Sequence, residues 1–442
     1  MDLTAIAHRN SDTFMKYRIF FRARYYYPIF TLLFLDFGLS LSQFAILNSI
    51  WALTIVLFEI PLGGLADTIG RRKIIILSAI LLNLELLIWL FAPINGGDAL
   101  FVFFLVNRII SGLCEAASSG ADEAIAYDSL EKAGLKDQWP KILEKTQRYT
   151  SLYFMFVLLL GASVYDPNFV TAVFRFFGGQ SDFTQADCIK LPIMLNLIAA
   201  VYVLINAFRF KEDWNHKMSI RDSIKLSFEN IFHSLKWIRK TSIVIIIILF
   251  LTVSESLILQ FLTLMQQYWK VIDIPIVFYG IIGSVLALFA SVIPSVGKKL
   301  YNKFTLKTNF LYCYIALMIA FAFIALSIPI YGVLPVILLY CTYQLITYFN
   351  SCYLNVNCSE RFRATVLSVQ SMFSFSKYGI ISILYSFLVA AISNDLIQSS
   401  LSQVFRISLV AFPLYFVLST LTVFTIARCY LINKKPKRMS KP

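Results

Sequence analysis

Seven ionisable side chains lie within stretches of this sequence that are otherwise strongly apolar, and they are the first candidates for chemistry. In chain order they are Asp36, Glu59, Glu85, Arg108, Glu115, Glu255 and Lys377. A charge at the centre of a bilayer costs ~2.5 to 3.5 kcal/mol on insertion scales, so a charge in a membrane segment is by default a functional candidate. Carboxylates in such positions can accept and release protons, and a nearby cation keeps them ionised.

Arg108 and Glu115 are separated by two helical turns and therefore lie on one face of a helix. Gly112 lies between them and allows a neighbouring helix to approach closely. A cation beside titratable carboxylates is what a proton relay needs. We therefore expect proton coupling to depend on Asp36, Arg108, Glu115 and Glu255. The alternative for Arg108 is a buried ion pair that fixes helix packing.

The elements that would position these residues are apolar helices. The 442 residues are 58% hydrophobic and 14% charged, and apolar runs near the ~20 residues that span a bilayer recur along the chain. Hydropathy predicts twelve spanning helices, the first two at 26–47 and 49–66. The predicted organisation is a cytoplasmic tail (1–25), a six-helix bundle (26–209), a linker with an amphipathic helix (210–241), a second six-helix bundle (242–430) and a basic cytoplasmic tail (431–442).

Positive charge is distributed according to the expected topology. Of the 39 Lys and Arg residues, 33 lie on segments of one predicted side, which the positive-inside rule assigns to the cytoplasm. The net charge of +14 therefore indicates membrane orientation and attraction to anionic lipid, and we expect no nucleic-acid partner. Seven Cys residues show no metal-type spacing, so neither a metal site nor a disulfide framework is expected.

One polar stretch between two apolar runs carries a recognisable motif. Residues 63–73 read Gly-Gly-Leu-Ala-Asp-Thr-Ile-Gly-Arg-Arg-Lys, in which glycines allow a tight reversal and Asp67 places a carboxylate at a helix end. The stretch resembles the signature of the loop between the second and third helices of the major facilitator superfamily of secondary transporters. The resemblance implies an all-α membrane protein with two pseudo-symmetric six-helix halves and both termini in the cytoplasm. Pro294-x-x-Gly297 with Lys298 and Lys299 is a fainter counterpart in the second half.

Residues 118–130, 58–61 and 363–368 are similar to stretches of a poorly characterised bacterial branch of that superfamily. This similarity implies a conformational gate at the cytoplasmic side, which closes against the start of the eleventh helix and stabilises the outward-open state. Its members would be Gly63, Asp67, Gly70, Arg71, Asp122 and Glu123. The alternative for Asp122 and Glu123 is a pair of solvated charges at a helix end.

The resemblance also implies that the first, fourth, seventh and tenth helices line a substrate cavity. The tenth expected helix offers hydroxyl, amide and aromatic groups, which suit an uncharged polar or mixed solute. The expected cavity residues are Tyr343, Gln344, Thr347, Tyr348 and Asn350, with Lys377 from the eleventh helix. The alternative is that these side chains satisfy backbone groups between helices.

Several motifs are absent from the sequence. There is no P-loop, no zinc-binding His-Glu-x-x-His and no Gly-x-Ser-x-Gly, so neither ATP-driven transport nor common hydrolase chemistry is supported. The fifth expected helix lacks the Gly-Pro-x-x-Gly-Gly run typical of drug/proton antiporters. We therefore expect a monomeric secondary transporter of the bacterial cytoplasmic membrane, not an enzyme, that moves a small organic solute with protons and needs no cofactor. The alternatives are an uncoupled facilitator and a non-transporting membrane sensor or scaffold with the same fold.

Overall fold

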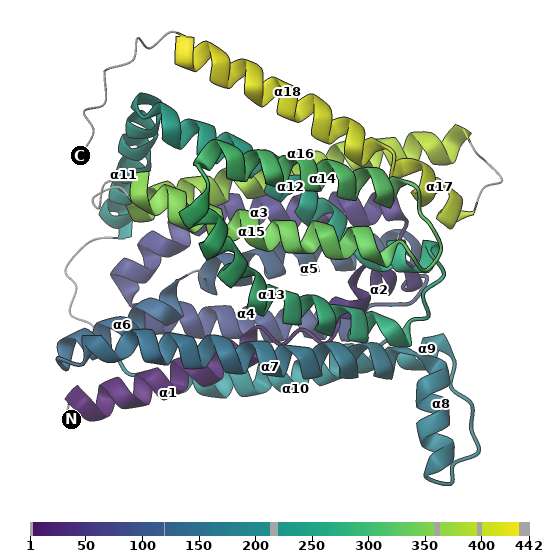
Figure 1. Cartoon of the computed structure of the whole chain (residues 1–442). Coiled ribbons are helices and arrows are strands. Elements are labelled where there is room, and N and C mark those ends of the chain that lie inside the picture. The colour runs from purple at the N-terminus through teal and green to yellow at the C-terminus, as the bar shows by residue number, and fades with distance from the viewer. Residues whose placement is uncertain (1–2, 119, 213–219, 358–362, 396–399, 433–442) are drawn as a thin grey trace.

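The computed structural model describes residues 3–118, 120–212, 220–357, 363–395 and 400–432. Within these ranges the regular elements are all helices, and most of them run lengthwise through one bundle (Figure 1). The N-terminal part contains α1 (Leu3–Phe21), η1 (Tyr27–Ile29), α2 (Phe30–Asp36), α3 (Leu41–Ile69), α4 (Arg71–Phe91), α5 (Gly97–Ser118), α6 (Ala121–Lys132), η2 (Lys136–Gln138), α7 (Trp139–Tyr165), α8 (Pro167–Phe176), α9 (Gln185–Cys188) and α10 (Leu191–Arg209).

The C-terminal part begins after a linker. It contains the linker helix α11 (Ile220–Lys240), followed by α12 (Ser242–Val271), α13 (Val277–Lys303), α14 (Leu306–Ala325), α15 (Val333–Asn357), α16 (Arg363–Asp395), α17 (Leu401–Ser408) and α18 (Ala411–Ile432). Helix α11 lies across one end of the bundle, where it packs against α3, α12 and α16.

Eleven helices in the described part of the chain are long and apolar enough to cross a membrane, and a shorter apolar helix covers Tyr27–Asp36. The expected all-helical membrane architecture is therefore confirmed, with the shorter helix as a twelfth apolar segment. Many large apolar side chains on these helices face outward, which is the surface that a bilayer covers.

The first crossing is broken, and the helix expected at 26–47 is wrong. The chain turns between α2 and α3, where Gly38 has a φ of 112°, a value that favours glycine. Ser40 then caps α3 by accepting from the backbone N–H of Gln43 in a capping box. Residues 41–47 therefore belong to the second crossing helix. Hydropathy does not reveal the turn, because the apolar run continues through it.

Residues assigned to the N-terminal tail form the ordered helix α1, which packs against α6, α7 and α10. Asn10, within this helix, ties it to the residue pair after α10, since its side-chain amide donates to the Lys211 carbonyl at 2.8 Å and accepts from the Lys211 N–H at 2.9 Å. In Figure 1, α1 lies at the end of the bundle that carries α6 and α11, and α2 lies toward the opposite end. The break between them, residues 22–29, lies inside the bundle.

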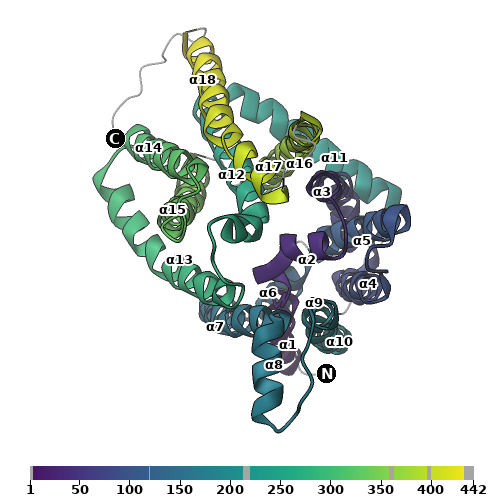
Figure 2. The ribbon, with the colours of Figure 1, turned by 90° about the vertical axis from the view of Figure 1, so that its right-hand side faces the viewer.

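The two groups of helices face each other along a central interface. Seen end-on, the helices from α3 to α10 lie on one side and those from α12 to α18 on the other (Figure 2). Helix α3 packs along α16, α7 along α13, and α2 against α12. Gly280 of α13 permits close packing on α7, because an added Cβ would lie 2.5 Å from the Leu158 carbonyl oxygen. The three helix pairs α3 with α16, α7 with α13 and α2 with α12 enclose an interior space that polar side chains line.

Candidate functional site

A cavity of about 400 Å³ lies between the two groups of helices. Its wall is formed by the broken first crossing, α3, α5 and α7 on one side and by α12, α13, α15 and α16 on the other. The volume lies within the ~300 to 1,000 Å³ typical of small-molecule sites. Aromatic residues dominate the wall, and three charged side chains, Arg24, Arg108 and Glu115, line it.

A second cavity, here called the vestibule, lies beside the first toward one end of the bundle. This second space, of about 820 Å³, shares Tyr27 and Phe154 with the central cavity and is lined by Arg18, Arg22 and residues of α7 and α13. Its cations, including Arg148, belong to segments that the positive-inside rule places in the cytoplasm. The vestibule therefore borders the central cavity on the side that is expected to be cytoplasmic.

The opposite ends of the helices are joined across the central interface. Thr31 of α2 bonds to the Thr263 carbonyl of α12, and Gln266 donates to the Tyr27 carbonyl at 3.0 Å. The hydroxyls of Ser42 in α3 and Ser386 in α16 are 2.7 Å apart. Thr263, Gln266 and Tyr27 join the halves in the cavity wall itself, whereas Ser42 and Ser386 join them near the ends of α3 and α16 that lie away from the vestibule.

Arg108 projects from α5 into this cavity and is 3% exposed. Its guanidinium donates to the Asn107 side-chain oxygen at 3.1 and 3.2 Å and lies 5.1 to 5.6 Å from the ring centroids of Phe30, Phe34 and Trp89. Among the described residues, no carboxylate forms an ion pair with it. Aromatic faces and one amide thus contact a buried cation that has no direct ion-pair partner in the described part of the chain.

Arg24 reaches the same cavity from the break between α1 and η1 and is 5% exposed. Its guanidinium lies 5.1 Å from the Phe21 ring centroid, and its Nη1 atom has no hydrogen-bond partner in the described structure. The adjacent Tyr26 hydroxyl donates to the buried Glu85 at 3.2 Å. Arg24 and residues 26–28 can occupy the cavity wall because the helix is interrupted there.

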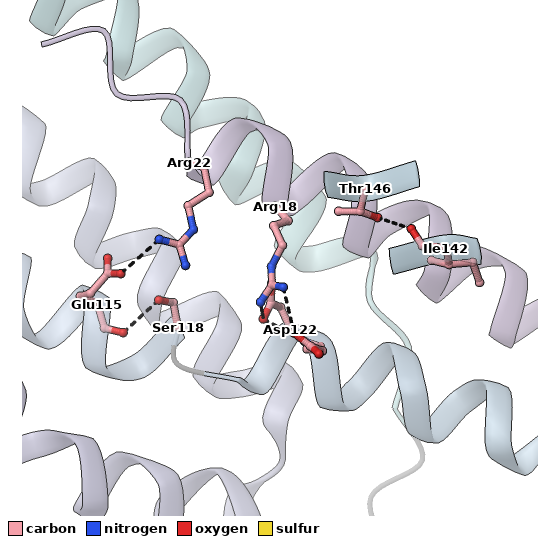
Figure 3. Close-up of polar contacts among 8 residues, drawn as sticks. Arg18, Arg22, Glu115, Ser118, Asp122, Ile142 and Thr146 are labelled. Atoms are coloured by element: carbon pink, nitrogen blue, oxygen red, sulfur yellow. Dashed lines mark hydrogen bonds and ion pairs between the residues drawn. The ribbon is translucent and has the colours of Figure 1, made fainter. Parts of the chain in front are cut away.

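Glu115 lies where the central cavity joins the vestibule. Its Oε1 atom is 3.7 Å from Nη1 of Arg22, and the side chains are 32% and 57% exposed (Figure 3). Arg108 and Glu115 therefore lie on one face of α5, as expected from their spacing, since both line this cavity. Glu115 pairs with Arg22 from the first crossing, a partner that the sequence did not indicate.

Known proteins share this architecture. The family model described as Major Facilitator Superfamily matches residues 19–383. The chain belongs to the major facilitator superfamily. The resemblance carried by residues 63–73 is thereby confirmed, and a transporter rather than an enzyme is indicated. A search of curated protein sequences finds no significant match.

Solved transporters of this superfamily share the fold at low identity. A bacterial homologue of the human lysosomal transporter Spinster, in an inward-facing and unoccupied conformation, has a TM-score of 0.69 and 16% identity, over 99% of each chain. The nucleoside transporter NupG has a TM-score of 0.69 and 13% identity, over 96% of this chain and 99% of that one. The xylose transporter XylE from E. coli, partially occluded and inward-open, has a TM-score of 0.63 and 13% identity, over 95% and 98% of the two chains.

The two other expected proton-coupling carboxylates lie away from the central cavity. Asp36 ends α2 and accepts from the Tyr165 hydroxyl at 2.6 Å, toward the outer end of this superfamily fold. Glu255 of α12 is 9% exposed and accepts from Gln370 at 2.8 Å and Ser374 at 2.9 Å. Both therefore lie in hydrogen-bonded sites outside the cavity wall, and the structure does not bring them together with Arg108 and Glu115.

The residues expected to line the cavity from the last helices are not in its wall, which α15 enters through Tyr340 instead. The Thr347 hydroxyl donates to the Tyr343 carbonyl at 3.0 Å, and Asn350 donates to Gln370 at 3.2 Å. Tyr348 packs against Gly297, whose added Cβ would lie 2.7 Å from the ring. Gln344 and Lys377 are half-buried.

The cytoplasmic gate residues are divided between two ion-pair sites within the N-terminal half. Arg18 of α1 binds Asp122 through Nε at 3.0 Å and Nη2 at 3.1 Å, and reaches Glu123 through Nη1 at 2.9 Å. Figure 3 shows Arg18 and Arg22 projecting from α1 and from the residues after it toward the ends of α5 and α6. The Arg18 and Asp122 pair is bidentate and largely buried, so it holds α6 onto α1.

Arg71 forms the second pair, with Asp128 of α6. The Glu212 carboxylate accepts from the backbone N–H groups of Arg71 at 3.2 Å and Arg72 at 2.9 Å, and so caps the start of α4. Gly70, with a φ of 105°, makes the turn between α3 and α4.

Two further gate residues have simpler descriptions. An added Cβ at Gly63 would meet no atom within 4 Å. The side chain of Asp67 lies outside the described part of the structure.

Sequence reasoning missed the contribution of the broken first crossing. Arg24, Tyr26 and Tyr27 line the cavity, and all three belong to the run Arg-Ala-Arg-Tyr-Tyr-Tyr-Pro at 22–28. The signal for a break was Pro28, which disfavours a helical conformation in the preceding residue. Because the cations of this run were counted with the cytoplasmic tail, their place in the interior was not expected.

Proposed function

We propose that this protein moves a small organic solute across the bacterial cytoplasmic membrane by alternating access, with protons as the coupling ion, and acts as a monomer. One observation carries the proposal: a cavity between the two six-helix halves borders a vestibule on the side expected to be cytoplasmic, whereas the Ser42 and Ser386 hydroxyls join the halves at the other end. Such a geometry supports a cycle in which the outer contacts separate as the vestibule closes.

Glu115 is the proposed proton carrier. It lies at the junction of cavity and vestibule, where a proton from the cytoplasm can reach it, and its ion pair with Arg22 has a length of 3.7 Å. Arg108 lies two turns deeper on the same helix. Its cation favours the ionised form of nearby carboxylates, so binding of a solute at Arg108 would change the affinity of Glu115 for protons.

The structure also suggests how the cytoplasmic pairs behave during this cycle. The pairs of Arg18 with Asp122 and of Arg71 with Asp128 join elements of the same half. They therefore keep α1, α4 and α6 together as one body while the halves move against each other. The contacts that must break are those between halves, such as Ser42 with Ser386.

A liposome assay tests this proposal. The purified chain is reconstituted with a pH-sensitive dye inside, and a panel of anionic, zwitterionic, uncharged and cationic solutes is added outside. Movement of protons with one solute class, lost in Glu115→Gln and retained in the surface variant Glu131→Gln, is the expected result. Labelled flux without proton movement would indicate an uncoupled facilitator, and absence of both would favour a sensor or scaffold.

A further inference from the structure

We infer that the central cavity selects an organic anion: an oxyanion head, carboxylate or phosphate, held between Arg24 and Arg108, on an apolar or aromatic body. The inference deepens the proposed function by naming its substrate class. It rests on the charges, hydrogen bonds and wall of the cavity.

The charged groups around the cavity do not balance. Arg24 and Arg108 line it, are 5% and 3% exposed, and have no ion pair with a carboxylate among the described residues. Glu115 also lines the cavity, but Arg22 is its partner. Glu85 is buried behind Tyr26, accepts its hydroxyl, and is not part of the wall. The cavity wall itself therefore carries two cations and one carboxylate, and that carboxylate is paired with Arg22 from outside the wall.

A buried guanidinium without a counter-charge is unfavourable, because its donors and its charge have both lost water. Arg108 uses its donors on one amide oxygen, and Nη1 of Arg24 donates to no atom of the described chain. A ligand oxyanion would supply acceptors and a counter-charge to both guanidinium groups. The planar fork of Arg matches a carboxylate or phosphate through paired N–H to O bonds. The gain is largest in a cavity shielded from water.

The remaining wall describes the rest of the ligand. Trp51, Phe154, Trp269 and Tyr378 contribute aromatic faces from α3, α7, α12 and α16. The uncharged polar groups in the wall are the side chains of Asn48, Ser111, Thr263 and Gln266 and the hydroxyls of five tyrosines. A wall in which most residues are aromatic or aliphatic and which carries two guanidinium groups favours an anion with an apolar body. An organic cation would meet two like charges.

Direct binding measurements on the full-length chain in a non-ionic detergent test this inference. Four probes share one ring system: 2-naphthylacetate, 2-naphthyl phosphate, the uncharged 2-naphthylacetamide and the cationic 2-(2-naphthyl)ethylamine. Equilibrium dialysis gives each dissociation constant, and dialysis against protein-free micelles corrects for partition into detergent. Arg24→Gln and Arg108→Gln remove one head contact each. Arg175→Gln, in an exposed pair on α8, is the control.

The expected result is binding of at least one anion about tenfold tighter than the amide, as one charge-assisted contact provides, with the amine weakest. The preference is expected to fall to about threefold or less in each cavity variant and to persist in Arg175→Gln. Arg24→Lys, which keeps the charge, should retain part of it if Arg24→Gln does not yield monodisperse protein. Equal binding of amide and anions, tighter binding of the amine, or binding of none of the probes overturns the inference.

Because binding is measured without a proton gradient, its outcome is separate from that of the transport assay. Selective anion binding without solute-driven proton movement would leave the inference standing and refute the proposed function. Proton movement driven by uncharged solutes alone would do the reverse.

Discussion

Glu115 of α5 and Arg22, which follows α1, form an ion pair of 3.7 Å at the boundary between the central cavity and the cytoplasmic vestibule. The pair joins α5, the fourth crossing helix, to the residues after α1, where the first crossing is interrupted. Both side chains are partly exposed, so the pair contributes little to stability. Its position makes it suited to respond to a proton or a solute that enters from the cytoplasm.

The first prediction concerns the carboxylate of this pair. Glu115→Gln keeps the shape of the side chain but removes its charge and its ability to carry a proton. We expect solute-driven proton movement in liposomes to fall at least ~tenfold, which corresponds to ~1.4 kcal/mol, while the protein remains folded. Unchanged proton movement in Glu115→Gln would assign the proton to another group, of which Glu255 is the next candidate.

The second prediction concerns the stability of the cytoplasmic end. Arg18→Ala leaves Asp122 buried without its bidentate partner, and removal of one member of a buried pair is strongly destabilising. We expect a loss of about 2 to 3 kcal/mol in the free energy of unfolding in detergent, since Arg18 itself is only partly buried. Lys16→Ala, which breaks an exposed pair with Asp12, should cost less than ~0.5 kcal/mol.

A second substitution separates charge from packing at this site. If the cost of Arg18→Ala comes from the unpaired carboxylate, Asp122→Asn should recover part of it in the double variant. A double variant that is as unstable as the sum of the two single variants would instead show that the residues act independently.

The third prediction compares two glycines. Gly161 of α7 packs against the carbonyl of Tyr25 at the break in the first crossing, and an added Cβ there would overlap the Tyr25 oxygen. We expect Gly161→Ala to lower the unfolding free energy by ~1 to 3 kcal/mol through overpacking. Gly63→Ala, with no atom near the new methyl, should be neutral or stabilising by up to ~1 kcal/mol. Equal effects at both positions would contradict the packing of α7 on the break.

Much of the fold could be predicted because its signals are local. Apolar runs identify the crossing helices, and the motif at 63–73 identifies the superfamily, whereas the cytoplasmic side that the cations indicate stays a prediction. The first crossing was placed incorrectly although Gly38 and the capping box at Ser40 mark its end. An apolar run that continues through a tight turn gives the same hydropathy as one long helix.

The candidate site was predicted less completely because it depends on how helices are rotated. Arg108 and Glu115 were expected on one face of a helix and both line the cavity. On α15, however, Tyr340 faces the cavity, whereas Tyr343 and Thr347 do not line it. Helical spacing shows which residues share a face, but only packing against neighbouring helices determines which face meets the cavity.

The central claim is that the halves separate at the outer end during each transport cycle, and the Ser42 and Ser386 contact tests it most directly. Their hydroxyls are 2.7 Å apart across the halves, so Ser42→Cys with Ser386→Cys should form a disulfide on oxidation. In liposomes, with the solute that moves protons in the wild type, the oxidised double variant should lose this movement and regain it on reduction. Each single Cys variant should be unaffected by oxidation. Undiminished transport with the disulfide fully formed would contradict alternating access at this interface.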